Sequence, residues 1–139
     1  MHRRASLSRH GWPSLFVSGG PFDDIIIDGK RLIPGLGSSA YICPGVGLGI
    51  AISRSRLVPG EIFLIAAQTL ANQLSEVDRA KGRLYPSLGR IRKISLAVAK
   101  RTVEFVYDRG LAGAPRPKDI ESYIRAQMYE PNYRDYIHP

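Results

Sequence analysis

Two short segments rich in glycine and serine carry the side chains best suited to hold a ligand. The first contains Ser18, Gly19 and Gly20, and the second contains Ser38 and Ser39 directly after a glycine. Backbone N–H groups and hydroxyls in such loops form concavities that bind anions, so either segment could hold an anion or a polar substrate. Segments of this composition are also common as plain turns. Both interpretations stay open on composition alone.

A third glycine-rich segment, residues 45–49 (Gly-Val-Gly-Leu-Gly), departs from the dinucleotide-binding fingerprint. That fingerprint is G-x-G-x-x-G after a strand, with an acidic residue about 20 positions further on. Here the third glycine comes one residue early, Pro44 precedes the first glycine, and Thr69 stands where the acid is needed. We therefore expect these glycines to allow close helix packing rather than to bind phosphate.

The other residues that could do chemistry do not form a catalytic or metal-binding set. None of the three histidines is spaced for metal ligation or for a nucleophile–base pair. They are His2, His10 and His138. Asp23 and Asp24 are adjacent, so in a strand they would face opposite sides, and Cys43 stands in an apolar run that predicts a buried thiol. The sequence therefore predicts no catalytic residue and no metal ligand in this chain.

The composition is typical of a folded globular protein rather than a disordered one. Of 139 residues, 44% are hydrophobic and 23% are charged. A single cysteine excludes an intramolecular disulfide and a multi-cysteine metal site. The longest uninterrupted apolar run, residues 62–67, is far shorter than the roughly 20 residues that a membrane-spanning helix needs. We expect no association with a membrane.

The net charge of +8 raises the question of an anionic partner. The first 22 residues contain three arginines and no acidic residue, a composition typical of a transit peptide or of a solvated tail. Elsewhere the basic residues are interspersed with acidic ones and do not form a stripe with interleaved aromatics, as a nucleic-acid interface would. We therefore expect no nucleic-acid partner.

The N-terminal third of the chain predicts short strands. Residues 15–17 form a strand-like run, and Asp28-Gly29 between two β-prone runs predicts a hairpin. Residues 34–39 are a loop by composition. Residues 40–56 combine apolar side chains with three glycines, and fit a strand, a loop or a buried helix.

The rest of the chain predicts helices. Helical periodicity marks residues 61–74 and 88–109, separated by a polar connector over residues 75–83. In the first helix, four further apolar residues would widen the buried stripe: Leu64, Ala67, Ala71 and Leu74. Ser87 is the expected N-cap of the second helix, and Gly110 is its expected C-terminal stop.

A last helix is predicted to begin at Pro117, with Tyr123 and Ile124 facing inward. Three tyrosines follow it, and they could cover the core or dock on a partner subunit. They are Tyr129, Tyr133 and Tyr136. The predicted fold class is mainly α with a short β-hairpin start. So few strands form a poor sheet by themselves. We therefore expect the chain to be the end of a longer protein.

Ordered matches along the chain resemble the malic enzyme family. Residues 18–22 (Ser-Gly-Gly-Pro-Phe) are similar to the family's S-G-S-P-F, and residues 34–49 are similar to P-G-Q-x-N-N-x-Y-I-F-P-G-x-G-L-G. Further matches lie at residues 66–71, 82–86, 91–95, 115–119 and 128–133. The resemblance runs from about Leu15 to Tyr136 and covers only the C-terminal portion of the family's much longer chain. It implies that residues 41–56 are helical.

The resemblance implies a division of this chain, in which residues 1–11 are an unmatched basic tail. Residues 12–38 would be the end of the Rossmann-type NAD(P)-binding domain, and residues 39–114 the helical part of the substrate domain. Residues 115–139 would be a C-terminal segment used in subunit packing. The chain would then be a C-terminal fragment of an α/β enzyme with an incomplete core. We expect marginal stability or aggregation when it is isolated.

The resemblance also implies an activity, the oxidative decarboxylation of malate to pyruvate with NAD or NADP and Mn or Mg. The family's catalytic tyrosine and lysine, its metal ligands and its dinucleotide fingerprint lie upstream of the matched portion. The isolated chain is therefore expected to be inactive. Family members occur in cytoplasm, mitochondrion and plastid, so the compartment stays open.

This chain departs from the family where a ligand is expected. The family's two asparagines, the first of which contacts the substrate carboxylate, fall on Ser38 and Ser39. By the same resemblance, the loop of residues 18–20 would contact the cofactor. A serine hydroxyl is shorter than an amide and would leave a gap or need a water. Two alternatives follow: a portion of a malic enzyme, or a non-catalytic interaction protein that packs against full-length malic enzyme subunits.

Overall fold

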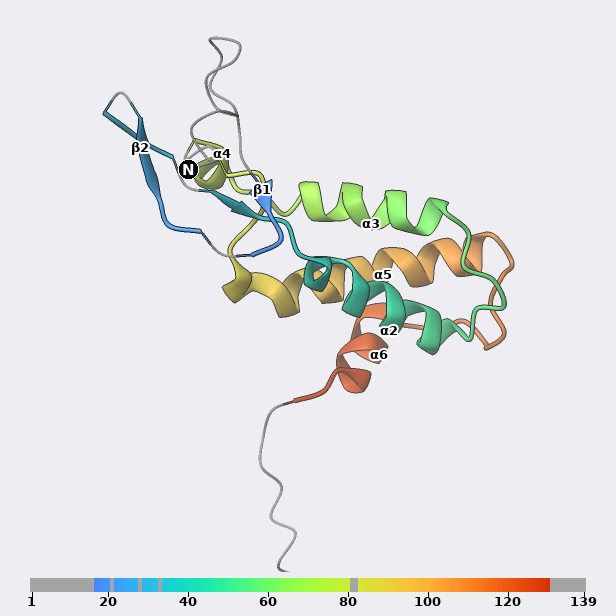
Figure 1. Cartoon of the computed structure of the whole chain (residues 1–139). Helices are drawn as coiled ribbons and strands as arrows, with labels where there is room; N and C mark the ends of the chain where they lie inside the picture. The colour runs from blue at the N-terminus through green and yellow to red at the C-terminus, as the bar shows by residue number, and fades with distance from the viewer. Residues whose placement is uncertain (1–16, 21, 28, 33, 81–82, 131–139) are drawn as a thin grey trace, which may run out of the picture.

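The computed structural model describes residues 17–20, 22–27, 29–32, 34–80 and 83–130 (Figure 1). The expected basic tail, the three histidines and the tail tyrosines Tyr133 and Tyr136 lie outside these ranges. Within them the chain is mostly helical, with two small sheets in its N-terminal part.

A β-hairpin and a parallel strand pair make up these sheets. β2 (Ile25–Ile27) and β3 (Lys30–Leu32) pair antiparallel, and Gly29 between them has a φ of 72°. Glycine adopts this left-handed conformation without the clash that a side chain would make, and the predicted hairpin is confirmed. β1 (Val17–Ser18) and β4 (Gly35–Leu36) pair in parallel.

β4 lies within residues 34–39, which composition predicts to be a loop. That prediction is wrong for Gly35–Leu36, because these residues form the strand by pairing with β1. Val17 lies opposite Gly35, and Ser18 lies opposite Leu36. A two-residue strand that contains glycine has no periodic pattern of its own, so only its distant partner defines it.

The helices begin with a short 3-10 turn, η1 (Ser39–Tyr41), that leads into the first α-helix. The helices that follow are α2 (Cys43–Ser53), α3 (Glu61–Ala71), α4 (Glu76–Ala80), α5 (Ile91–Asp108) and α6 (Ile120–Gln127), with a 3-10 turn η2 (Leu88–Arg90) before α5. Helix α2 resolves the ambiguity over residues 40–56 in favour of the helix that the resemblance implies. No helix within the described ranges is both long and apolar enough to cross a membrane.

One of the two predicted end signals of α5 is confirmed. Gly110, with a φ of 67°, follows the last turn and is the expected stop. Ser87 Oγ accepts a hydrogen bond from the Gly89 amide at 3.4 Å, but it caps the 3-10 turn η2 and not α5, whose own N-cap residue is Arg90. The helix predicted over residues 88–109 therefore begins as a 3-10 turn, and the α-helix itself starts at Ile91.

Helix α5 is the centre of the molecule, between α3 on one side and α2 and α6 on the other (Figure 1). One buried cluster joins α5 to α2 and α3, and a second joins α5 to α6. The first consists mainly of Ile94, Val98 and Val106 with Val46, Ile62, Ala66 and Leu70. The second consists of Leu96, Ala99, Val103 and Ile124.

Two glycines allow α2 to lie close against α5. A Cβ at Gly45 would lie 2.7 Å from the Ser95 carbonyl oxygen, and one at Gly49 would lie 2.7 Å from Thr102 Cβ. Real Cβ atoms do not approach other atoms so closely, so these positions need glycine. The expectation that glycines of residues 45–49 serve helix packing is confirmed for Gly45 and Gly49 but not for Gly47. Gly47 is exposed, and a Cβ there would meet nothing within 4 Å.

Helix α3 buries a narrower face than the sequence predicts. Ile62 and Ala66 are fully buried as expected, but Leu64, Ala67 and Ala71 are exposed. Among the described elements, α5 makes most of the contacts with α3, so only the stripe that faces α5 is covered. The helix also ends at Ala71 rather than at residue 74.

The last helix begins later than predicted. The Asp119 carboxylate accepts a hydrogen bond from the Ser122 amide at 3.1 Å and caps a helix that starts at Ile120, not at Pro117. Ile124 is fully buried as expected, but Tyr123 is 44% exposed, because only one face of α6 meets α5. The polar connector over residues 75–83 contains α4.

We expect Gly45→Ala to lower the free energy of unfolding by about 1–3 kcal/mol, because the added methyl group overpacks the contact with α5. Gly47→Ala is the matched control, and it should raise stability by up to about 1 kcal/mol through helix propensity alone. Thermal unfolding followed by circular dichroism compares the two variants with the unsubstituted chain. Equal midpoints for both variants would contradict the close approach of the helices.

Candidate functional site

The parallel strand pair places the two glycine- and serine-containing loops side by side. β1 leads into Gly19 and Gly20, and β4 leads into Gly37, Ser38 and Ser39. In a parallel pair the carboxyl ends of both strands lie at the same edge. The Gly37 amide donates a hydrogen bond to the Ser18 carbonyl oxygen at 2.8 Å, so the strand pairing continues into the loops.

This edge presents hydrogen-bond donors to solvent. Ser18 Oγ accepts from the Gly20 amide at 3.4 Å, and Ser38 Oγ accepts from the Ala40 amide at 3.3 Å. In both cases the hydroxyl proton is not used in the bond and can be donated to a ligand. The other serine of the second loop, Ser39, is exposed. The edge can therefore bind and orient an anionic or polar group.

Gly37 is required at the junction of the two loops. A Cβ at this position would lie 2.6 Å from Val17 Cγ1 and 3.6 Å from the Tyr85 hydroxyl. By contrast, a Cβ at Gly19 or Gly20 would meet nothing within 4 Å. The first loop is therefore open to an approaching ligand, whereas Gly37 is confined by packing.

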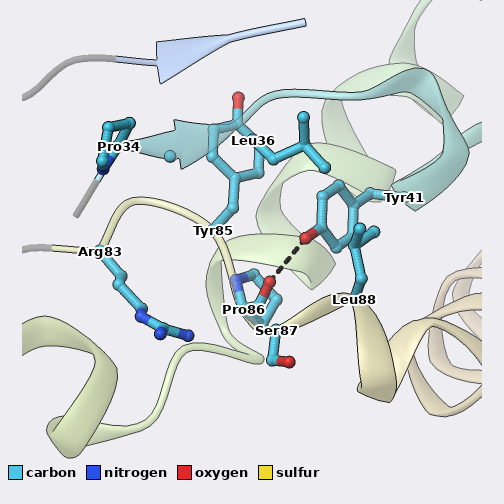
Figure 2. A pocket seen from close by; sticks show the side chains of 9 residues that line it. Pro34, Leu36, Tyr41, Arg83, Tyr85, Pro86, Ser87 and Leu88 are labelled. Carbon is cyan, nitrogen blue, oxygen red and sulfur yellow. Dashed lines mark hydrogen bonds between the residues drawn. The ribbon is translucent and has the colours of Figure 1, made fainter. Parts of the chain in front are cut away.

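Tyr41 anchors the second loop to the rest of the molecule (Figure 2). It ends η1, is 1% exposed, and its hydroxyl donates to the Pro86 carbonyl oxygen at 2.6 Å. Its ring stacks on Tyr85 with centroids 5.6 Å apart. Burial raises the pKa of the Tyr41 hydroxyl above its ordinary value of 10.0, and the charge of Arg83 opposes that shift. The neutral hydroxyl therefore keeps its bond to Pro86 at neutral pH.

Sequence reasoning assigns no role to Tyr41, Tyr85 or Pro86. The segment that holds two of them, residues 82–86, is one of the matches to the malic enzyme family, and this was the available signal. The contact itself links residues 45 positions apart along the chain. Only the tertiary structure reveals that this segment supports the second loop.

The described residues do not fit a divalent metal. Across the described ranges, no three histidine, cysteine, aspartate or glutamate residues come together as a metal site requires. Asp24, one of the two adjacent aspartates, accepts a hydrogen bond from Arg31 Nε at 2.6 Å.

Cys43 is exposed, so the prediction of a buried thiol is wrong. It lies in the first turn of α2, two residues before the buried Gly45. Two residues correspond to about 200° around a helix, so the thiol faces away from α5. The apolar run around Cys43 reflects the helix as a whole rather than this position.

Comparison with known proteins gives consistent matches. A family profile described as "Malic enzyme, NAD binding domain" matches residues 9–107. The mitochondrial NADP-dependent malic enzyme of Homo sapiens is 43% identical over 121 residues, which are 86% of this chain and 20% of the relative. The NADP-dependent malic enzyme of Phaseolus vulgaris is 44% identical over 124 residues, 88% of this chain and 21% of the relative.

A third relative is named as NAD-dependent rather than NADP-dependent. The mitochondrial NAD-dependent malic enzyme of Ascaris suum is 39% identical over 125 residues, 89% of this chain and 19% of the relative. The chain thus spans about a fifth of the length of the curated relatives that it matches.

We expect Tyr41→Phe to lower the free energy of unfolding by about 1–3 kcal/mol, because it leaves the buried Pro86 carbonyl without its donor. Tyr129→Phe, at a tyrosine that is 80% exposed, is the matched control and should change little. Urea unfolding of the three chains measures the difference. A Tyr41→Phe variant as stable as the control would contradict the anchoring role.

The comparison of the unsubstituted chain with Tyr41→Phe also predicts how their difference in stability depends on pH. The folded-state pKa of Tyr41 lies above its ordinary value of 10.0, so folding favours the protonated hydroxyl. The stability that it contributes is complete below pH 10 and is lost as the pH rises through the folded-state pKa. The advantage of the unsubstituted chain over Tyr41→Phe should therefore shrink above pH 10, and an advantage that grows would contradict this assignment.

Proposed function

Because this chain belongs to the malic enzyme family, we propose that it forms part of the ligand-binding wall of an enzyme that converts malate to pyruvate with NAD or NADP. The observation that carries the proposal is the parallel β1–β4 pair, whose carboxyl ends bring the two loops together. Ligands of open α/β enzymes bind at this edge of a parallel sheet. The hydroxyls of Ser18, Ser38 and Ser39 there suit a carboxylate or a polar cofactor.

Each loop has its own role in this proposal. Ser18, Gly19 and Gly20 contact the cofactor, and their open surroundings leave room for it. Ser38 and Ser39 face the substrate carboxylate, to which each hydroxyl can donate one hydrogen bond. Because a hydroxyl reaches less far than the family's amide, we expect weaker binding of malate than with asparagine at these positions.

The division of the chain is also a proposal. Residues 12–38 would close the NAD(P)-binding domain, residues 39–114 would complete the substrate domain, and residues 115–139 would pack against another subunit. The change from paired strands to helices at residue 39 supports the first boundary. The profile match over residues 9–107 continues across it.

We further propose that the isolated chain does not turn over malate. The described residues do not fit a metal, and the chain spans about a fifth of its relatives' length. In a complete enzyme, Mn or Mg and the catalytic acid and base would be held by other segments. The part described here would bind and orient ligands rather than transfer protons.

A chimera tests the proposal. Residues 17–130 replace the matching segment of the human mitochondrial relative, and the rate of NADPH formation from malate is measured with Mn²⁺ present. We expect the KM for malate to rise about tenfold or more, because the shorter hydroxyl weakens a hydrogen bond to a charged group. Ser38→Asn in the chimera should lower the KM again, because the amide restores the reach.

The control for this assay is Ala51→Asn, at an exposed position of α2, which should leave the KM unchanged. Asparagine is itself a good N-cap, so Ser38→Asn should not disturb the turn that follows. If Ser38→Asn leaves the KM for malate of the chimera unchanged, the substrate role of this loop is contradicted. Turnover by the isolated chain would contradict its dependence on other segments.

An exposed apolar surface supports the second candidate, a non-catalytic protein that packs against full-length malic enzyme subunits. Phe63 and Leu64 on α3 are 51% and 61% exposed, and Leu57 and Val58 just before the helix are 63% and 50% exposed. Adjacent exposed apolar side chains of this size mark protein interaction sites. In this candidate the α3 surface contacts a malic enzyme subunit.

We expect Phe63→Glu combined with Leu64→Glu to weaken co-purification with a full-length malic enzyme at least tenfold, because charges would be buried at the contact. Val77→Glu, at a position of α4 that is 62% exposed, is the matched control and should have no effect. Equal capture of both variants, or no capture of the unsubstituted chain, would count against the interaction protein.

A further inference from the structure

We propose that a pocket beside β4 binds a small organic monocarboxylate with a flat apolar body. The pocket has a volume of about 210 Å³ and lies between β4, Tyr41 and the segment that leads into η2 (Figure 2). Drug-sized ligands occupy pockets of about 300 Å³ or more, so this one suits a fragment the size of benzoate. The ligand is additional to malate and does not depend on the proposed function.

Arg83 gives the pocket its charge preference. It is the charged residue among the described residues that line the cavity. Its Nε is buried, and no described group accepts a hydrogen bond from it. Its Nη1 lies 3.9 Å from Asp78 Oδ1, too far for a hydrogen bond. Because arginine cannot be deprotonated in a protein, these donors favour an anion.

The neighbouring carboxylate does not neutralise this charge. Asp78 also lies 3.7 Å from Arg90 Nη1, so two guanidinium groups share one carboxylate. Hydrogen bonds from Ser75 hold the pKa of Asp78 below its ordinary value, and it stays ionised at neutral pH. Arg90 also donates to the Gln73 carbonyl at 2.9 Å. Arg83 thus keeps a buried Nε donor that no described group uses.

The walls of the pocket decide the shape of the ligand. Pro34, directly before β4, and Leu36 of β4 line the pocket together with Tyr85 and Leu88, so most of the surroundings are apolar or aromatic (Figure 2). The Tyr41 hydroxyl already donates to Pro86 and has no proton left for an anion. One planar guanidinium matches one planar carboxylate through two parallel hydrogen bonds. A phosphate or a dicarboxylate carries further negative charge. That charge would lie against apolar side chains with no cation to pair with it.

The test is an NMR titration of the full chain carrying labelled leucine methyl groups, with benzoate and with benzamide as its neutral counterpart of the same shape. We expect benzoate to shift the methyl signals of Leu36 and Leu88 saturably, with a dissociation constant at least tenfold lower than that of benzamide. No saturable shift at these methyl groups, or benzamide binding as tightly as benzoate, would overturn the proposal.

Substitutions of single arginines test whether Arg83 supplies the positive charge that binds benzoate. Arg83→Gln should weaken benzoate binding at least tenfold, as expected for losing a charge-assisted hydrogen bond. Arg79→Gln, at an exposed arginine of α4 outside the pocket lining, should leave it unchanged. Equal weakening by both variants would mean a diffuse charge effect and overturn the site. If Arg83→Gln does not fold, the comparison of benzoate with benzamide on the unsubstituted chain decides alone.

Discussion

The contact between α2 and α5 sets the position of nearly everything that could bind a ligand. α2 reaches α5 because Gly45 and Gly49 have no side chain, and any Cβ there would collide with α5. This contact holds the start of α2, and with it the turn that begins after Ser38. Tyr41 secures the same end through its bond to Pro86. Helix packing therefore orients the second loop.

The strand pair then connects this packed part to the first loop, which follows β1. β4 is attached to the helices through η1, and β1 is joined to β4 by parallel pairing, which the amide of Gly37 extends. The side chains of Val17 and Tyr85 close around Gly37 and leave the carboxyl edge open beside it. One face of this arrangement presents hydroxyls and amides, while the pocket behind β4 presents rings and a guanidinium. Two chemically different surfaces thus share one short strand.

Much of the helical structure could be predicted from sequence, because α5 and the inner face of α3 have clear periodicity and Gly110 marks a helix end. The packing role of Gly45 and Gly49 was also predictable from their spacing. Strand β4 could not be predicted from the sequence, because its two residues become a strand only beside β1. The exposure of Leu64 and Cys43 was missed because an apolar run does not reveal how much of a helix its neighbours cover. Both loops were found as candidates by composition, but their proximity required the fold.

The central claim is that β1 and β4 pair in parallel and bring the loops at Ser18 and Ser38 to one edge. Amide hydrogen exchange at Gly37 tests it most directly, because this amide donates to the Ser18 carbonyl at 2.8 Å. We predict exchange slowed relative to an unstructured peptide, together with nuclear Overhauser contacts between Ser18 and Gly37. Exchange of the Gly37 amide at the unstructured rate, without those contacts, would contradict the account.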